Sequence, residues 1–217
     1  YGLTKGQYSP TSERGFVSKS SPYGTVEDPF IPAELCFGAR GRFFARSLDI
    51  DMKLLGSCMV AAAQHKGAAI VEVLVNCVIF NDGVHKGVAD RATREERSIV
   101  LRHGEKMIFG KDKNKGIVLD GLRLKAVTIG EDGYTLDDVL THDAHEEDPT
   151  LHTMLAMMGT NDDMPVAMGV IRDVAGISYD EAVTQQIEEV KAQKPGIRKL
   201  EDVLLKDAYW EVKAEDL

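Results

Sequence analysis

The chain has 217 residues and a formal net charge of −9, from 26 basic and 35 acidic residues. This acidic balance repels phosphate groups, so it argues against a sequence-independent nucleic-acid binder and against a protein that binds anionic membranes. Apolar residues at 43% and charged residues at 28% are typical of a globular protein, and no apolar run reaches the roughly 20 residues of a membrane span.

The first 30 residues are rich in Gly, Pro, Ser and Thr, which leaves no room for a regular helix or strand. A lead of this length is usually functional or disordered. Gly2 and Gly6 allow a ligand to approach the backbone, and Thr4, Lys5 and Gln7 offer hydrogen-bond donors, so a phosphate or substrate contact is one interpretation. Composition alone favours the other interpretation, a frayed terminus.

An alternating α/β pattern follows, which predicts a right-handed βαβ unit. Asp49 or Asp51 is expected to cap the long helix, because a carboxylate accepts the free N–H groups of a first turn. The last strand is almost continuously apolar, which is typical of a parallel strand buried on both faces. The predicted elements are a short helix from Pro32, a strand over 43–46, a helix that ends at Gly67 and a strand over 68–75.

Short strands separated by Gly and Asp begin after residue 83 and predict a meander, before the pattern turns helical. This change of pattern after residue 83 predicts two domains, 1–83 and 84–217. One face of the last long helix is apolar and is expected to point inward: Ala182, Val183, Ile187 and Val190. The predicted elements are strands over 98–101, 106–109, 116–119, 124–129 and 166–170, and helices over 149–158, 179–194 and 200–205.

His142 and His145 lie three positions apart among four acidic residues. These ligand types suit zinc, so a small metal-dependent hydrolase is one hypothesis. No helix supplies a fixed register and no third His or Cys is placed to complete a site, and acidic residues before a helix are also favoured by the helix dipole. A solvated acidic turn is therefore the simpler interpretation.

Three cysteines at wide spacing do not form a disulfide framework, which favours a reducing, cytoplasmic compartment. Cys36 and Cys58 fall on apolar helix faces, where cysteine acts as a small hydrophobe. Cys77 differs because it follows the best strand candidate, and ligands collect at the carboxyl ends of strands in α/β sheets.

Two segments, YGLTKGQYSPTS at 1–12 and EVLVNCVIFND at 72–82, resemble the β subunits of 2-oxoacid:ferredoxin oxidoreductases, most closely the 2-oxoglutarate type. The resemblance continues through 21–24, 61–74 and 142–144 and weakens after Gly159. It implies an α/β thiamine diphosphate-binding fold, with a mostly parallel sheet, flanking helices and a smaller C-terminal extension of short strands and helices. The family's GDG…N motif, which holds Mg²⁺ and the diphosphate, precedes Tyr1, so the chain is expected to be the C-terminal part of a longer subunit.

The same resemblance implies the site residues. Gly2, Leu3 and Thr4 would lie against thiamine diphosphate, with Leu3 beside its reactive carbon and the substrate. Lys5 would belong to an active-site loop and is a candidate partner for a second substrate carboxylate. Cys77 would be one ligand of a [4Fe–4S] cluster whose other three cysteines lie upstream, because such a cluster needs four thiolates.

The implied reaction is the oxidative decarboxylation of 2-oxoglutarate with coenzyme A to succinyl-CoA and CO₂, with electrons passed through the cluster to ferredoxin. An α subunit of the same enzyme is the implied partner, and neither a nucleic acid nor a membrane is expected. Without the upstream residues this chain alone is expected to be inactive. The same chemistry on pyruvate or branched-chain 2-oxoacids, and a noncatalytic assembly module that retains the fold, are the alternatives.

Overall fold

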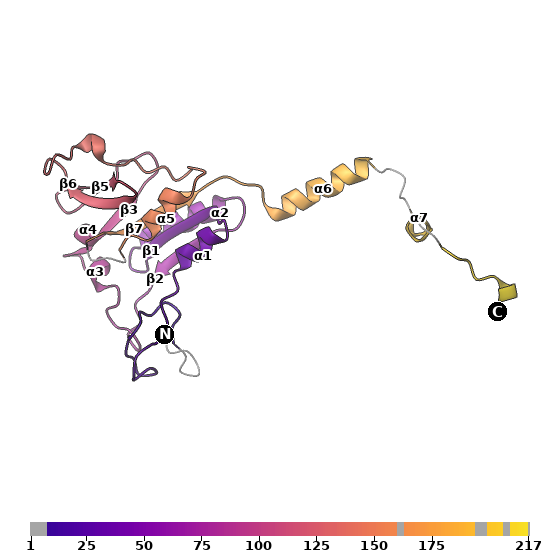
Figure 1. Ribbon diagram of the computed structural model, residues 1–217, viewed down its shortest axis with the longest axis horizontal. Coiled ribbons are helices and arrows are strands. Elements are labelled where there is room, and N and C mark those ends of the chain that lie inside the picture. The colour runs from indigo at the N-terminus through magenta and orange to yellow at the C-terminus, as the bar shows by residue number, and fades with distance from the viewer. Residues whose placement is uncertain (1–7, 160–162, 194–198, 206–208, 217) are drawn as a thin grey trace. The chain divides into compact units, whose positions relative to one another are not determined.

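The computed structural model describes residues 8–159, 163–193, 199–205 and 209–216 (Figure 1). The chain groups into two compact units, Tyr1–Gly176 and Ile177–Leu217. The two domains predicted from the sequence, 1–83 and 84–217, stay a prediction.

A four-stranded sheet forms the centre of the first unit. Its order is β2 (Ile70–Leu74), β1 (Phe43–Leu48), β7 (Val166–Asp173) and β3 (Ser98–Leu101). Two of the three pairings are parallel, β1 with β2 and β3 with β7, while β1 and β7 run antiparallel. The prediction of an α/β fold with a mostly parallel sheet is confirmed at this level.

The predicted βαβ unit is present as β1, α2 (Met52–Gln64) and β2. Asp51 is the cap of α2, since its side chain accepts a hydrogen bond from the Leu54 N–H at 3.1 Å. All six residues of β1 are buried, and Cys58 of α2 packs into the same core.

β2 was predicted to be buried on both faces, and this was wrong. Within the described chain β2 pairs only with β1, at the edge of the sheet, and its residues are exposed or half-buried. An apolar strand sequence indicates that the strand can pack against a covered surface, but it does not show whether a second strand pairs on its other side.

The predicted meander exists in part. β4 (Ile108–Phe109), β5 (Lys115–Asp120) and β6 (Arg123–Thr128) form an antiparallel three-stranded sheet. The strand expected at its start, β3, instead joins the main sheet, where Ile99 pairs with Ala167 of β7. Both residues are almost fully buried, so the larger core determines the partner of β3.

Helices complete the first unit. Pro32 occupies the first turn of α1 (Pro32–Gly38), whose Cys36 and Phe37 are buried, and α5 (Thr150–Ala156) packs against β7. The core that joins both sheets includes Phe44, Ile117 and Leu155. The remaining helices of this unit are α3 (Lys86–Ala89), α4 (Arg94–Arg97) and η1 (Leu136–Asp138).

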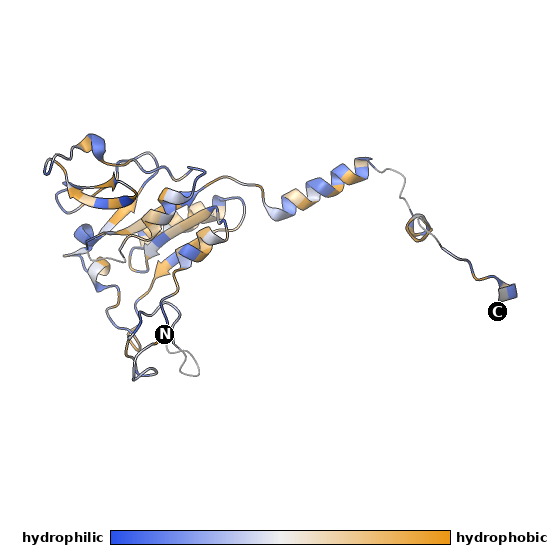
Figure 2. Ribbon diagram, in the orientation of Figure 1, coloured by the Kyte–Doolittle hydropathy of each residue, from blue (hydrophilic) through white to orange (hydrophobic). Residues whose placement is uncertain are grey.

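The second unit contains α6 (Tyr179–Gln193), α7 (Leu200–Leu204) and η2 (Ala214–Asp216). Within the second unit no residue of α6 is buried, so the inward apolar face expected on this helix stays a prediction. Figure 2 shows hydrophobic and hydrophilic residues alternating along this helix. Among the described residues, no helix is both long and apolar enough to cross a membrane.

Candidate functional site

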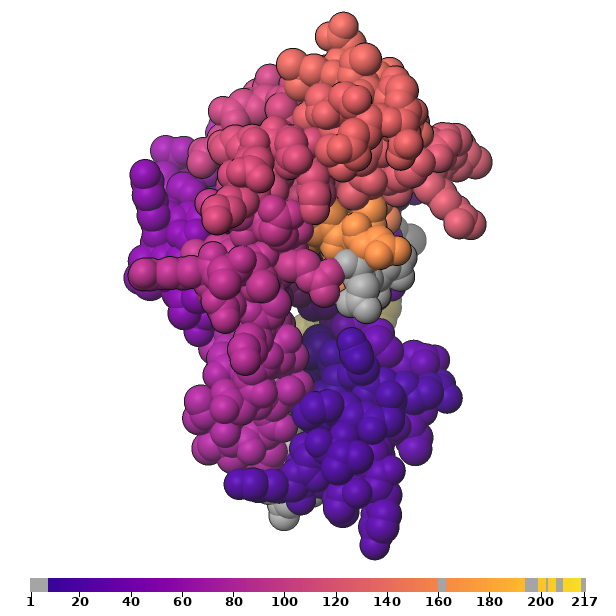
Figure 3. All heavy atoms as spheres, turned by 90° about the vertical axis from the view of Figure 1, so that its left-hand side faces the viewer, coloured from indigo at the N-terminus to yellow at the C-terminus, as the bar shows by residue number. Residues whose placement is uncertain are grey.

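One end of the first unit gathers two segments that the sequence singled out. Residues 8–30, here called the lead segment, and the turn that follows β2 lie at the same end in two perpendicular views (Figures 1 and 3). The turn contains Cys77 and begins where parallel β1 and β2 have their carboxyl ends. This is the sheet edge at which α/β proteins place ligands.

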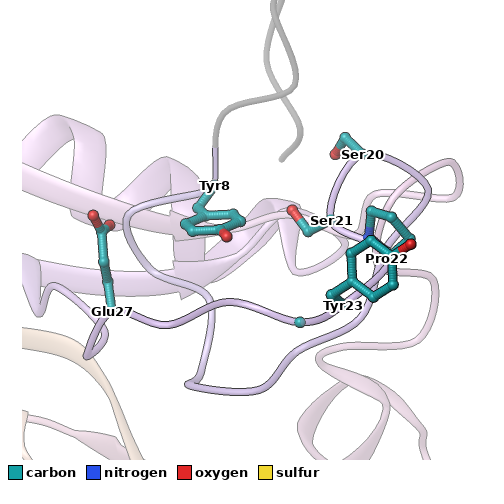
Figure 4. A pocket seen from close by; sticks show the side chains of 7 residues that line it. Tyr8, Ser20, Ser21, Pro22, Tyr23 and Glu27 are labelled. Carbon is teal, nitrogen blue, oxygen red and sulfur yellow. The ribbon is translucent and has the colours of Figure 1, made fainter.

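The lead segment encloses an open cavity of about 460 Å³. In Figure 4 the Tyr8 ring stands between Glu27 on one side and Ser20 to Tyr23 on the other. Four of the seven residues that line the cavity carry a hydroxyl group and one carries a carboxylate: Tyr8, Ser20, Ser21, Pro22, Tyr23, Gly24 and Glu27. Such a lining suits a polar ligand whose oxygens accept hydrogen bonds.

Backbone hydrogen bonds hold the lead segment in shape without a helix or strand. The Gly15 N–H donates to the Thr25 carbonyl at 2.8 Å, and the Thr25 N–H donates to the Phe16 carbonyl at 3.1 Å. Gly24 has a positive φ of 85°, and a Cβ there would lie 2.9 Å from the Gly15 carbonyl oxygen. Only glycine fits this close approach, so the cavity wall depends on it.

Cys77 lies in a tight turn that favours its thiolate. The Asn81 N–H donates to the Cys77 carbonyl at 2.9 Å, which closes the turn. The backbone N–H groups of Phe80 and Ile79 lower the pKa of the Cys77 thiol. The residue is half-buried and is not part of a disulfide. A half-buried thiol with a lowered pKa has the character of a metal ligand or a nucleophile.

The other two cysteines are core residues, as predicted. Cys36 and Cys58 are 2% and 1% exposed, and burial raises the pKa of both thiols. Neither can act as a ligand without a rearrangement of the core.

His142 and His145 do not converge on a common point. His142 is buried and donates from Nε2 to the Val170 carbonyl at 3.0 Å, and burial lowers its pKa. His145 donates from Nδ1 to the Asp173 carbonyl at 2.5 Å. Among the residues that the structure describes, no three His, Cys, Asp or Glu side chains are arranged to hold a metal ion. The acidic residues around them are exposed, but His142 is a core residue and not part of a solvated turn.

Two residues that lie within ten positions of Cys77 in the sequence were missed as site candidates. Asn76 donates to the Asp82 carboxylate and accepts from the Gly83 N–H. His85 lines a second cavity beyond the turn, and burial lowers its pKa although Asp49 and Glu72 act in the opposite direction. The position of Asn76 directly before the cysteine is the only signal that the sequence offered.

The predicted cofactor residues Gly2, Leu3, Thr4 and Lys5 lie outside the described residues. Tyr8, the first described residue, lines the cavity of the lead segment. Tyr8 directly follows the predicted motif in the sequence.

Comparison with known proteins places these features in context. No family model matches the chain. The 2-oxoglutarate oxidoreductase subunit KorB of Mycobacterium tuberculosis is 38% identical over 213 residues, which is 98% of this chain and 56% of that subunit. The chain is a homologue of 2-oxoacid:ferredoxin oxidoreductase β subunits. These relatives are subunits of oxidoreductases, so the resemblance predicted from the sequence is confirmed.

Shorter matches come from archaeal relatives. The β subunit of 2-oxoacid:ferredoxin oxidoreductase 1 of Aeropyrum pernix is 42% identical over 82 residues, covering 38% of this chain and 26% of that protein. The 2-oxoglutarate synthase subunit KorB of Archaeoglobus fulgidus is 39% identical over 77 residues, covering 36% and 29%.

A solved structure supports the fold. The 2-oxoglutarate:ferredoxin oxidoreductase from Magnetococcus marinus matches with a TM-score of 0.57 at 18% identity, over 95% of this chain and 54% of that one. The chain spans about half the length of that protein and of the Mycobacterium subunit.

Proposed function

We propose that the chain is part of the β subunit of a 2-oxoglutarate:ferredoxin oxidoreductase. The complete enzyme would convert 2-oxoglutarate and coenzyme A to succinyl-CoA and CO₂ and pass the electrons to ferredoxin. The observation that carries this proposal is the 38% identity to a 2-oxoglutarate oxidoreductase subunit over 98% of the chain. The naming of relatives as β subunits also supports an α subunit as the partner.

The proposal includes thiamine diphosphate and Mg²⁺. Gly2, Leu3 and Thr4 are the residues that would lie against the cofactor, by their match to the family motif. The hydroxyl-lined cavity that follows at Tyr8 fits a polar group at this place in the chain. When bound, thiamine diphosphate supplies the electron sink for decarboxylation. Leu3 would keep the reacting region apolar, which favours the loss of charge as CO₂ leaves.

The proposal also includes one [4Fe–4S] cluster, to which this chain would contribute Cys77. The donor fits, because Cys77 is a free, half-buried thiol and backbone N–H groups lower its pKa. Cys36 and Cys58 are buried elsewhere, so the other ligands would come from outside this chain. The cluster supplies one-electron transfer to ferredoxin.

The decisive experiment is ferredoxin reduction by the complete αβ enzyme with coenzyme A and each 2-oxoacid in turn. 2-Oxoglutarate should give the highest kcat/KM, ahead of pyruvate and branched-chain 2-oxoacids. Cys77→Ala should abolish ferredoxin reduction and lower the iron content. Cys58→Ala, which removes a core thiol, should retain the iron. Full iron and normal rates in Cys77→Ala would remove the ligand role.

Two further variants test the cofactor loop. Leu3→Asn should lower the decarboxylation rate or change the preference among 2-oxoacids. Lys5→Ala should raise KM for 2-oxoglutarate more than KM for pyruvate, because only 2-oxoglutarate has a second carboxylate. Equal changes for both substrates would assign the second carboxylate to another cation.

Iron content and the broad brown absorbance of a cluster in the full-length protein separate this function from a noncatalytic assembly module. A colourless, iron-free complete enzyme that reduces no acceptor would favour the assembly module.

A further inference from the structure

An apolar cavity, here called the hairpin groove, lies between the β5–β6 hairpin and the start of α5. Its volume is about 460 Å³, and α5 and β6 are in contact beside it. In Figures 1 and 3 the hairpin lies at the opposite end of the first unit from the lead segment, so the groove is separate from the candidate site. Five of its nine lining residues have large apolar side chains: Leu119, Leu122, Leu140, Leu151 and Met154.

The tip of the hairpin carries a leucine where a tight turn normally carries glycine or a polar residue. Asp120 pairs with Arg123, so Gly121 and Leu122 form a two-residue loop. Leu122 is 93% exposed and Leu119 is 53% exposed. Single exposed leucines are common on protein surfaces, but two of them at the border of an apolar groove are typical of a surface that a partner covers.

Two carboxylates give the hairpin groove an acidic rim. Glu146 and Asp148 line the groove and are exposed. Hydrogen bonds from the side chain and the backbone of Thr150 lower the pKa of Asp148, so this residue stays charged near neutral pH. Within the described ranges, neither carboxylate forms an ion pair with a Lys or Arg side chain. The rim therefore suits a partner that brings a basic side chain.

A buried cation of β7 fixes the rim. Arg172 is 5% exposed, and its Nη1 donates to the Glu146 carbonyl at 2.8 Å while Nη2 donates to the Glu147 carbonyl at 2.9 Å. The same Nη1 donates to Nδ1 of the buried His152 of α5 at 2.8 Å. Because Arg172 holds the rim by its backbone carbonyls, the rim is ordered before a partner binds, which lowers the entropic cost of association.

We propose that the hairpin groove docks the α subunit of the enzyme, through a segment that places an aliphatic side chain in the groove and a Lys or Arg against the acidic rim. This inference rests on the proposed function, which includes the α subunit as the partner. Charge argues against a second copy of this chain, because that copy has a net charge of −9 and the rim would repel it.

The first test measures the dissociation constant of the complete αβ enzyme by analytical ultracentrifugation. Leu122→Asp places a charge in the groove, and Asp suits a turn, so the hairpin should still fold. The variant should weaken the α–β association by about 10-fold or more, because a buried leucine contributes at least that much. Leu136→Asp is the matched control and should match the wild type, since Leu136 is 49% exposed and does not line the groove.

The second test removes the charge of the rim with the double variant Glu146→Gln/Asp148→Asn. Both amides keep an acceptor oxygen for the N–H groups of Asp148 and Thr150, so the turn should keep its shape. Added salt should weaken the wild-type αβ complex, because it screens the pairing of opposite charges. The dissociation constant of the double variant should rise less steeply with salt. An equal dependence on salt would overturn the basic character of the partner segment.

The third test identifies the occupant directly. A photoreactive benzophenone amino acid replaces Leu122 in the complete enzyme, and mass spectrometry finds the segment to which it links on irradiation. The proposal expects a segment of the α subunit with an aliphatic residue next to a Lys or Arg. A link to a second copy of this chain or to another part of the same chain, or no link at all, overturns the proposal.

The outcomes separate this inference from the proposed function. An αβ enzyme that reduces ferredoxin with 2-oxoglutarate, but whose association is unchanged in Leu122→Asp, overturns the docking site alone. A wild-type αβ enzyme that oxidises no 2-oxoacid overturns the proposed reaction, while a link from position 122 to the α subunit would still support the docking site. A full-length protein that assembles with no α subunit overturns both.

Discussion

Replacing Glu72 by Gln tests what fixes β1 and β2 in the sheet. Arg46 of β1 donates from Nε to the Glu72 carboxylate of β2 at 2.5 Å. Both side chains are largely buried, at 7% and 17% exposure. The same guanidinium also donates to the carbonyls of Ala156 at the end of α5, at 3.0 Å, and Ala167 of β7, at 3.4 Å. One side chain therefore ties two strands to each other and to a third strand and a helix.

The loss of unfolding free energy in Glu72→Gln follows from this burial. Removing one partner of a buried ion pair costs about 3–5 kcal/mol, because the other charge is left uncompensated. Gln retains an acceptor oxygen and Glu72 keeps some contact with water, so Glu72→Gln should cost about 3 kcal/mol, at the lower end of that range. The double variant Arg46→Met/Glu72→Leu buries no charge, but it leaves the carbonyls of Ala156 and Ala167 without their Arg46 donor. Its loss of unfolding free energy should come from these carbonyls, at about 1–3 kcal/mol for each well-made hydrogen bond that is lost.

The assay is chemical denaturation, with the free energy of unfolding taken from the linear extrapolation. Asp28→Asn is the control, since its ion pair with Arg14 is similarly short at 2.9 Å but both side chains are mostly exposed. This control should cost less than about 1 kcal/mol. If Glu72→Gln costs no more than Asp28→Asn, the reasoning from burial is refuted.

Three further predictions use other parts of the first unit. Burial lowers the pKa of His142 and of His152, so the unfolded chain binds more protons and stability should fall as the pH drops below about 6.5; a flat denaturation profile from about pH 7 to pH 5 would contradict this. Gly169→Ala should cost more than Gly104→Ala in unfolding free energy, because both have positive φ but only a Cβ at 169 meets a backbone oxygen, at 2.7 Å; equal costs would exclude that clash. In the isolated chain, Cys77 should react with iodoacetamide at neutral pH well before the two buried cysteines, and equal rates in the folded protein would contradict the geometry of its turn.

Local signals predicted the first βαβ unit well. The cap at Asp51 and the apolar run into β2 are contacts or patterns within one or two elements, and α2 lies where they indicate. The pairing partners of the strands were harder to predict from the sequence. β3 was expected in the meander and lies in the main sheet, because its partner β7 is more than sixty residues away and periodicity contains no information on that distance.

In the candidate site, too, the sequence predicted local features but not contacts between distant residues. The strand-end position of Cys77 was predicted from the order of elements, and the structure places it at that sheet edge. Asn76 contacts Asp82 and Gly83, which lie six and seven positions further along the chain, across a turn whose shape no single residue type predicts. The burial of His142 depends on β7, which follows it in the chain, so its ligand-like spacing to His145 was misleading.

The long-range pairing of β1 also sets the order in which the chain can fold during synthesis. β1 and β2 pair with only α2 between them, so this part is complete soon after Leu74 leaves the ribosome. The second edge of β1 pairs with β7, where Phe43 meets Asp173, so it must wait for a further hundred residues. During that interval the aromatic side chains of β1 lack their final cover, and contacts this distant in sequence form slowly. Slower translation between these two strands should therefore lengthen the time in which the nascent chain needs a chaperone.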